Sequence, residues 1–570
     1  MRNRIITSFI ATGLLSAAAM AVRADDLLKL VYEDAAVCLH VPRPVADWNR
    51  IQSSKFASRV VGSPLFQDWQ SSPEFKGLKG LQTVIEGVVQ KPLPQAAEEL
   101  FGRGFALAAY VAPGGEPDAV LLLEADSKQS INDLMNRLQQ FVDPQTEQQT
   151  HRDFVYDHWV GKDDNGFYFV RAGNVLALAE NADPVRRVID LHLDGETGDS
   201  LASREELITA RERRPEQQVA AVYIAPRAWD SHVTSDGETP QALKNAWQRC
   251  QWLTVRMRYD QAPTFDVEAD YDNVAAPEWW TRWVDLASKT RLPVERIPNN
   301  ALAAMSGLLD SPGIANVAGK SRDENEELPK DVRQLHRVMK GLLLGLDPLN
   351  DVLPALGPRW MAYVVPRQLS ESDALSKSFP ADMLFAIELQ ELQQTAEREA
   401  DSTQALHNTL VAGLNVLAAV HNTRTNQQVA TVRQKTVNEV TIRWAEPVAL
   451  FRPAYAITDD GYLLIASSPD LCEQFVRDSE QTASPVAELA GQLQFLVASS
   501  VAARQWLTTH KEWFLWRASK DKVPEDEAAR RLQQMDGFLQ MLDSVWFSTA
   551  LESDLIRMSA GVTVDSGTGE

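Results

Sequence analysis

Two stretches of twelve residues decide the fold: FYFVRAGNVLAL at residues 167–178 and YAITDDGYLLIA at residues 455–466. Each consists of two largely apolar runs separated by a glycine, Gly173 or Gly461. Runs rich in β-branched and aromatic residues predict strands, and a glycine between them supplies the positive φ that a hairpin turn favours. Each glycine is followed at the same distance by an aspartate, with a proline between that marks a helix start. We interpret the two stretches as one β-hairpin and helix that occur twice.

Other landmarks recur in the same order around this hairpin. Residues 109–113 read AYVAP and residues 362–366 read AYVVP, and each segment is followed by an apolar run that ends in a glutamate. Most strands arrive as hairpins rather than alternating with helices, which favours antiparallel pairing. We therefore predict an α+β fold of two homologous modules, each a mostly antiparallel sheet with helices packed on it.

The length of 570 residues is too great for one hydrophobic core and fits two modules with short additions. The landmarks predict four segments along the chain. These are a signal peptide at residues 1–24, a first module at 25–275, a Trp-rich helical linker at 276–297 and a second module at 298–570.

The N-terminal segment is typical of a secretory signal. Arg2 and Arg4 precede an apolar stretch over residues 5–22, and small residues offer cleavage after Ala21 or after Ala24. We expect an exported protein, periplasmic or extracellular. The alternative is an uncleaved anchor, because 18 apolar residues lie at the lower limit for a spanning helix. No later stretch is as long and apolar, so we expect no membrane span after the signal sequence.

The net charge and the cysteine spacing argue against several classes of partner and site. The formal net charge is −22, which disfavours nucleic acid and anionic lipid as partners. The three cysteines lie more than 200 residues apart, so their spacing predicts neither a disulfide framework nor a local metal site.

The sequence contains no established catalytic motif. It lacks G-x-S-x-G, H-E-x-x-H and the phosphate-binding glycine motifs, and we assign no catalytic, metal-binding or cofactor-binding residue. Glu124 and Glu388 are weak candidates because they occupy the same place in both copies, at the end of an apolar strand. Our favoured interpretation is that both are solvated strand ends.

Tryptophan is the one unusual residue in the composition, with 15 in the chain. Trp279, Trp280 and Trp283 lie in the predicted linker at spacings that make one stripe on a helix. We interpret this stripe as packing between the modules, with a partner surface as the alternative.

The segment SLAS at residues 200–203 is a helix entry that precedes the strand AVYI at 221–224. Together with the order of the strands and hairpins, it resembles a family of exported bacterial proteins of unknown function with tandem α+β modules. The resemblance implies export and a repeated α+β fold, and it implies no established activity.

We expect a non-catalytic exported protein that binds or scaffolds in the cell envelope, with an envelope protein or a glycan as the partner. One alternative is a hydrolase or glycan-active enzyme whose site lies in a cleft between the modules and uses Glu124 and Glu388. A second alternative is a periplasmic chaperone or carrier of hydrophobic ligands, which requires an apolar groove or cavity in at least one module.

Overall fold

The computed structural model divides into two compact units. Unit 1 consists of Met1–Val274 together with Asp554–Glu570, and unit 2 consists of Ala275–Ser553. The predicted signal peptide falls on residues that the structure does not describe, apart from Ala24. The described residues are 24–111, 118–142, 144–160, 166–195, 199–205, 207–208, 217–230, 244, 247–272, 278–315, 337, 340–341, 347, 352–367, 379–390, 402–425, 429–446, 452–477 and 486–564.

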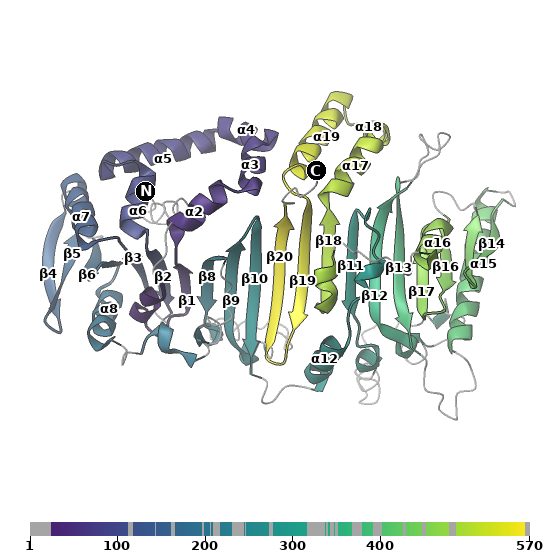
Figure 1. Cartoon of the computed structure of the whole chain (residues 1–570), viewed down its shortest axis with the longest axis horizontal. Coiled ribbons are helices and arrows are strands. Elements are labelled where there is room, and N and C mark those ends of the chain that lie inside the picture. The colour runs from purple at the N-terminus through teal and green to yellow at the C-terminus, as the bar shows by residue number, and fades with distance from the viewer. Residues whose placement is uncertain are drawn as a thin grey trace. The chain divides into compact units, whose positions relative to one another are not determined.

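Unit 1 contains an antiparallel sheet whose strands come from both ends of the chain (Figure 1). Its central strands β2 and β3 form a hairpin, and the last strand of the chain, β20, pairs with β10. In order of pairing the strands are β4 (Gln145–His151), β5 (Phe154–Val160), β6 (Gly166–Ala172), β7 (Val175–Ala179), β3 (Asp118–Glu124), β2 (Gly104–Tyr110), β1 (Val37–Val41), β8 (Gln218–Ile224), β9 (Cys250–Tyr259), β10 (Pro263–Tyr271) and β20 (Leu555–Thr563).

Helices cover parts of both faces of this sheet. One face forms the main core of unit 1, where Val185, Val188 and Ile189 of α8 are fully buried. On the other face α7 packs its Ile131 and Met135 on the strands. The helical segments are η1 (Ala24–Leu30), α2 (Pro44–Gln52), α3 (Lys55–Gly62), α4 (Pro64–Ser71), α5 (Pro73–Val89), α6 (Leu93–Phe101), α7 (Lys128–Val142), α8 (Ala182–Asp194), η3 (Leu201–Ser203) and η4 (Pro226–Trp229).

Unit 2 also contains an antiparallel sheet. Its central strands β12 and β13 pair with each other over most of their length. In order of pairing the strands are β14 (Thr431–Val437), β15 (Val440–Glu446), β16 (Ala454–Ile457), β17 (Tyr462–Ala466), β13 (Ala381–Leu389), β12 (Leu356–Pro366), β11 (Ala303–Leu308), β18 (Gln494–Ser499) and β19 (Ser544–Leu551).

The core of unit 2 lies on one face of its sheet. Helix α16 contributes Leu471, Cys472 and Phe475 to this core. Helix α15 packs on the opposite face, where Leu406 and Leu414 are buried. The helical segments are α12 (Glu278–Lys289), η5 (Val294–Arg296), η7 (Leu353–Ala355), α15 (Ser402–Thr425), α16 (Pro469–Arg477), η8 (Ala487–Gly491), α17 (Ser500–Thr509), α18 (Lys511–Lys520) and α19 (Glu525–Leu539).

The order of pairing is the same in the two units. Adding ten to the labels of β1 to β9 in unit 1 gives β11 to β19 of unit 2, and the two sets of strands pair in the same order. Both predicted hairpins are present, as β6–β7 and β16–β17, and their glycines have positive φ, 68° at Gly173 and 84° at Gly461. The predicted α+β class with antiparallel sheets is therefore confirmed.

The compact units do not end where the sequence suggested. Residues 554–570 belong to unit 1 because β20 extends its sheet through seven paired residues next to β10. The predicted linker contains α12, which belongs to unit 2.

Candidate functional site

The structure places Glu124 and Glu388 in different surroundings, and neither is the solvated strand end that we predicted. Glu124 is only 7% exposed at the end of β3, and Asn174 donates a hydrogen bond from Nδ2 to its Oε1 at 3.2 Å. Glu388 lies on β13 and accepts two hydrogen bonds from Arg359 on β12, at 2.9 Å from Nε and 2.7 Å from Nη2. These bonds raise the pKa of Arg359 above its ordinary value. Each carboxylate therefore has a neighbour in its own unit that fixes its position.

The three tryptophans of the predicted stripe do not share one environment. Trp280 is 9% exposed and donates its indole N–H to the carbonyl of Ser553 at 3.1 Å. Trp283 packs against the core of unit 2. Trp279 is 51% exposed. It differs from its neighbour Trp280 because adjacent residues on a helix point about 100° apart. Of the three, Trp279 is the most exposed and Trp283 is half-buried, and the expected role of the stripe in packing between the modules stays a prediction.

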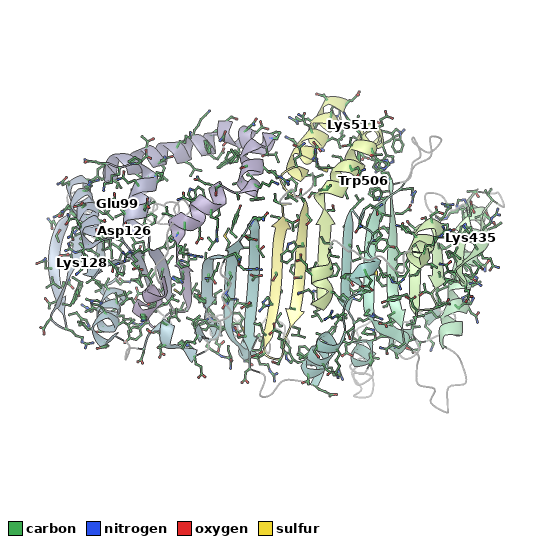
Figure 2. All side chains as sticks on the ribbon, viewed as in Figure 1. Glu99, Asp126, Lys128, Lys435, Trp506 and Lys511 are labelled. Carbon is green, nitrogen blue, oxygen red and sulfur yellow. The ribbon has the colours of Figure 1, made fainter. Side chains whose placement is uncertain are left out.

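Two other tryptophans, Trp506 and Trp513, have structural roles in unit 2. Trp506, labelled in Figure 2, lies on α17 and donates its indole N–H to the carbonyl of Pro380 at 2.8 Å. Its ring packs edge-on against Phe514 at 5.0 Å, and Phe514 packs in the same way against Trp513 at 5.2 Å. These aromatic contacts join α17 and α18 and leave the rings engaged with one another.

Metal or thiol chemistry finds no support in the described residues. Among them, no group of three or more His, Cys, Asp and Glu side chains is placed to hold a metal ion. All three cysteines are buried and free of disulfides. Burial raises the pKa of Cys38 and of Cys472 to about 12, and that of Cys250 to about 11. A thiol with such a pKa is a poor nucleophile near neutral pH.

The most unusual feature of unit 2 is an exposed apolar row across its sheet. One residue from each of six adjacent strands contributes to the row, in direct cross-strand register. The five large side chains in it are between 36% and 47% exposed. From β17 to β19 the row consists of Ile465, Phe385, Ala362, Met305, Leu496 and Phe547.

A second row lies beside the first on the same face. It includes Met383 on β13, which is 59% exposed, and Val545 on β19, which is 42% exposed. Val364, Ala303 and Ala498 connect these two residues across the intervening strands. We call the two rows together the apolar face of unit 2.

The sequence of the strands explains why this face is apolar. In β13 the five consecutive residues MLFAI are apolar, so both sides of the strand are apolar rather than one. Leu384 and Ala386 point into the core, and Met383 and Phe385 point to the other side. Strands of this kind are normally covered on both faces, whereas here residues with large apolar side chains remain exposed.

Helix α15 covers only one end of the face. It packs on Ile387 of β13 and Leu463 of β17, beyond the first row. At a strand spacing of about 4.8 Å the six strands of the row extend over roughly 24 Å. Gln494 and Thr549, hydrogen bonded to each other at 3.4 Å, form a polar border at the β18–β19 end.

The corresponding face of unit 1 is apolar but less exposed. Phe265 on β10 and Met558 on β20 are the large apolar side chains exposed there, at 49% and 40%. Met558 belongs to the corresponding cross-strand row, whose other members are half-buried except for the buried Leu121. From β7 to β20 the row consists of Leu178, Leu121, Leu107, Leu39, Val222, Val255, Val267 and Met558.

Comparison with known proteins gives one distant similarity. No family model and no curated protein sequence matches the chain. Among solved structures, one crystal form of TP0453, a protein of the bacterium Treponema, matches with a TM-score of 0.24 and 7% identity over 44% of this chain and 82% of TP0453. Another crystal form matches with a TM-score of 0.23 and 9% identity over 46% and 83%. A similarity this weak supports no statement about function. Within the described part of the chain, no helix has both the length and the apolar character needed to cross a bilayer.

Proposed function

We propose that the protein is a non-catalytic binding protein that holds the acyl chains of an amphiphilic ligand, such as a lipid, on the apolar face of unit 2. The single observation that supports this is the row of exposed side chains, in register, across six strands. Contiguous exposed apolar surface of this kind marks binding sites in soluble proteins. The proposal develops the alternative of a hydrophobic-ligand carrier, with a flat face in place of the groove or cavity that this alternative requires.

The backbone geometry favours an acyl chain over an extended peptide. Strands β11, β12, β13 and β18 each pair on both sides, so most of their backbone groups already have partners. A peptide laid across this face would lose hydration of its own backbone groups without gaining hydrogen bonds. An acyl chain has no such groups. Met305 and Met383 have flexible side chains that adapt to chains of different shape.

We further infer that units 1 and 2 arose by duplication of one module. The identical order of pairing in β1–β9 and β11–β19 supports this, as do the glycine hairpins at equivalent places. The apolar face would then be a shared property that is more exposed in unit 2 than in unit 1. The secretory signal expected at residues 1–24 supports a location in the cell envelope.

The proposal is tested by titrating the protein with saturated fatty acids of increasing length. Burying a methylene group contributes about 0.8 kcal/mol, and a flat face buries roughly half of each group. We therefore expect affinity to rise roughly tenfold for every three to four added methylenes. The variant with Met305→Gln and Leu496→Gln should bind at least about tenfold more weakly.

A matched control uses exposed apolar residues of unit 2 outside the face. Val416 and Leu417 on α15 are 61% and 46% exposed, so a variant with Val416→Gln and Leu417→Gln changes similar surface elsewhere. It should bind like the wild type. Absence of binding at every chain length, or equal loss in both double variants, would contradict the proposed function.

A further inference from the structure

A second exposed apolar surface lies in unit 1, on the connection between β1 and β2. Helices α3, α4 and α5 follow one another there, and none of the three contains a buried residue. We call residues 55–91, which contain these helices, the arm. Figure 1 shows α3, α4 and α5 as a continuous helical path in the N-terminal part of the chain.

The arm has a regular start to each helix. Ser54, Ser63 and Ser72 are the N-caps, nine residues apart, and each hydroxyl accepts a hydrogen bond from the backbone N–H three residues later at 3.1 to 3.2 Å. Caps of this kind fix where a helix begins but contribute only about 1 kcal/mol each.

These caps are insufficient to explain why the helices form. Helices α3 and α4 have eight residues each, a length at which isolated helices are marginal in water. Helix α5 contains Gly77, Gly80 and Gly87, which lower its intrinsic helix stability. A Cβ atom placed on any of these glycines would have no neighbouring atom within 4 Å, so close packing does not require them. A surface that covers the apolar side of the arm would supply the missing stabilisation.

The apolar side of the arm is large and aromatic. Trp69 is 42% exposed and packs its ring against Phe66 at 5.4 Å and against Phe75 at 4.8 Å. Further along, Leu78 is 43% exposed and Val84 is 52% exposed. Aromatic side chains with one polar edge, such as tryptophan, favour the boundary between water and hydrocarbon.

The charge of the arm is opposite to that of the protein. The whole chain has a net charge of −22, yet the arm contains more basic than acidic residues. Its five basic residues are Lys55, Arg59, Lys76, Lys79 and Lys91, and its three acidic residues are Asp68, Glu74 and Glu86. Helical segments that combine exposed aromatic and aliphatic residues with basic residues are typical of helices that lie in a membrane interface.

We propose that the arm docks the protein on an anionic lipid surface. The local positive charge and the exposed tryptophan favour this partner, because anionic headgroups attract basic residues while the apolar side enters the boundary region. The net charge of −22 repels an anionic surface and a second copy alike, so the choice between them rests on the basic residues and the exposed tryptophan of the arm. This inference is independent of the proposed function, since it concerns different residues in a different unit.

The test is flotation of the full chain with two kinds of vesicle, one of phosphatidylcholine alone and one containing about a third phosphatidylglycerol. We expect flotation with the anionic vesicles, and at least about a tenfold loss of the bound fraction at 0.5 M salt, because salt screens headgroup attraction. The triple variant Trp69→Ser, Leu78→Ser and Val84→Ser should lose flotation, and so should Lys76→Glu with Lys79→Glu.

Three controls make the result specific to the arm. A variant with Val501→Ser and Phe538→Ser removes exposed apolar surface from α17 and α19 of unit 2 and should float like the wild type. The Met305→Gln, Leu496→Gln variant should also float, which separates this inference from acyl-chain binding. A chain that begins at Asp25, measured alongside, removes any contribution of the N-terminal apolar stretch.

Several outcomes would overturn the inference. These are absence of flotation of the chain that begins at Asp25, equal flotation with neutral and anionic vesicles, and flotation that survives the arm variants. A concentration-dependent dimer that the triple arm variant abolishes would identify a second copy as the partner instead.

Discussion

Arg557 and Glu268 are 289 residues apart in the sequence, and the Nε of Arg557 lies 2.8 Å from Oε1 of Glu268. Arg256 pairs with the other oxygen of the same carboxylate, whose residue is only 3% exposed. Two residues along the same pair of strands, Ser559 donates a hydrogen bond to Asp266 at 2.6 Å. These buried polar contacts attach the last strand of the chain to β10, so the C-terminal strand stabilises a unit built mainly from the N-terminal half.

We predict that Glu268→Gln strongly destabilises unit 1. The amide cannot balance the charges of Arg256 and Arg557, and leaving a buried charge without its partner costs about 3 to 5 kcal/mol. Urea unfolding should show a lower midpoint for the transition of unit 1. Glu147 is the matched control because its side chain is 65% exposed, and Glu147→Gln should change stability by less than about 0.5 kcal/mol.

The same carboxylate predicts a dependence of stability on pH. Burial by itself raises the pKa of Glu268, but Arg256 and Arg557 outweigh burial and hold the pKa below the ordinary value of 4.5. A carboxyl whose pKa is lowered by folding stabilises the folded state above its unfolded pKa and loses that contribution as the pH falls through the folded pKa. The difference in melting temperature between wild type and Glu268→Gln should be constant above about pH 5 and shrink below about pH 4.5. A constant difference down to pH 3 would contradict this assignment.

We predict a structural rather than a catalytic role for Glu388. Its two hydrogen bonds to Arg359 are partly exposed to solvent, so Glu388→Gln should cost about 1 kcal/mol of stability. Fatty-acid affinity should be unchanged, because the side chain lies outside the two rows of the apolar face. Arg359→Met should have a similar effect on the urea midpoint, and a much larger effect of either change on ligand binding would argue for a direct role.

Neighbouring residues of β13 should respond differently to truncation. Leu384 is 1% exposed and points into the core, so Leu384→Ala should cost about 2 to 5 kcal/mol. Met383 is 59% exposed on the apolar face, and Met383→Ser should change stability by less than about 0.5 kcal/mol. Thermal unfolding of both variants checks the assignment of faces, and equal destabilisation would place Met383 in a packed environment.

The three cysteines should be unreactive in the native protein. Burial raises the pKa of Cys38, Cys250 and Cys472 well above that of a free thiol, to about 12, 11 and 12. A thiol-specific chromogenic reagent at pH 8 should therefore label none of them within minutes, and all three after unfolding in urea. Rapid labelling of one cysteine in native buffer would reveal local opening around it.

The candidate site was only partly accessible from sequence. The sequence identified Glu124, Glu388 and the three linker tryptophans by position, but their environments depend on Asn174, Arg359 and Ser553, which are 29 to 273 residues away. The apolar run in β13 was visible as a strand. The sequence did not show that one side of β13 stays exposed, because the apolar run has the composition of a strand buried on both faces.

The sequence alone determined the α+β class, both glycine hairpins and the apolar strands next to them. These features depend on local preferences, since a glycine between two apolar runs favours a hairpin wherever the rest of the chain goes. The tertiary structure decided that β20 pairs with β10, that Arg557 meets Glu268, and which face of unit 2 remains open. The physical reason is that the burial of a side chain depends on the segments that pack on it, and here those segments come from distant parts of the chain.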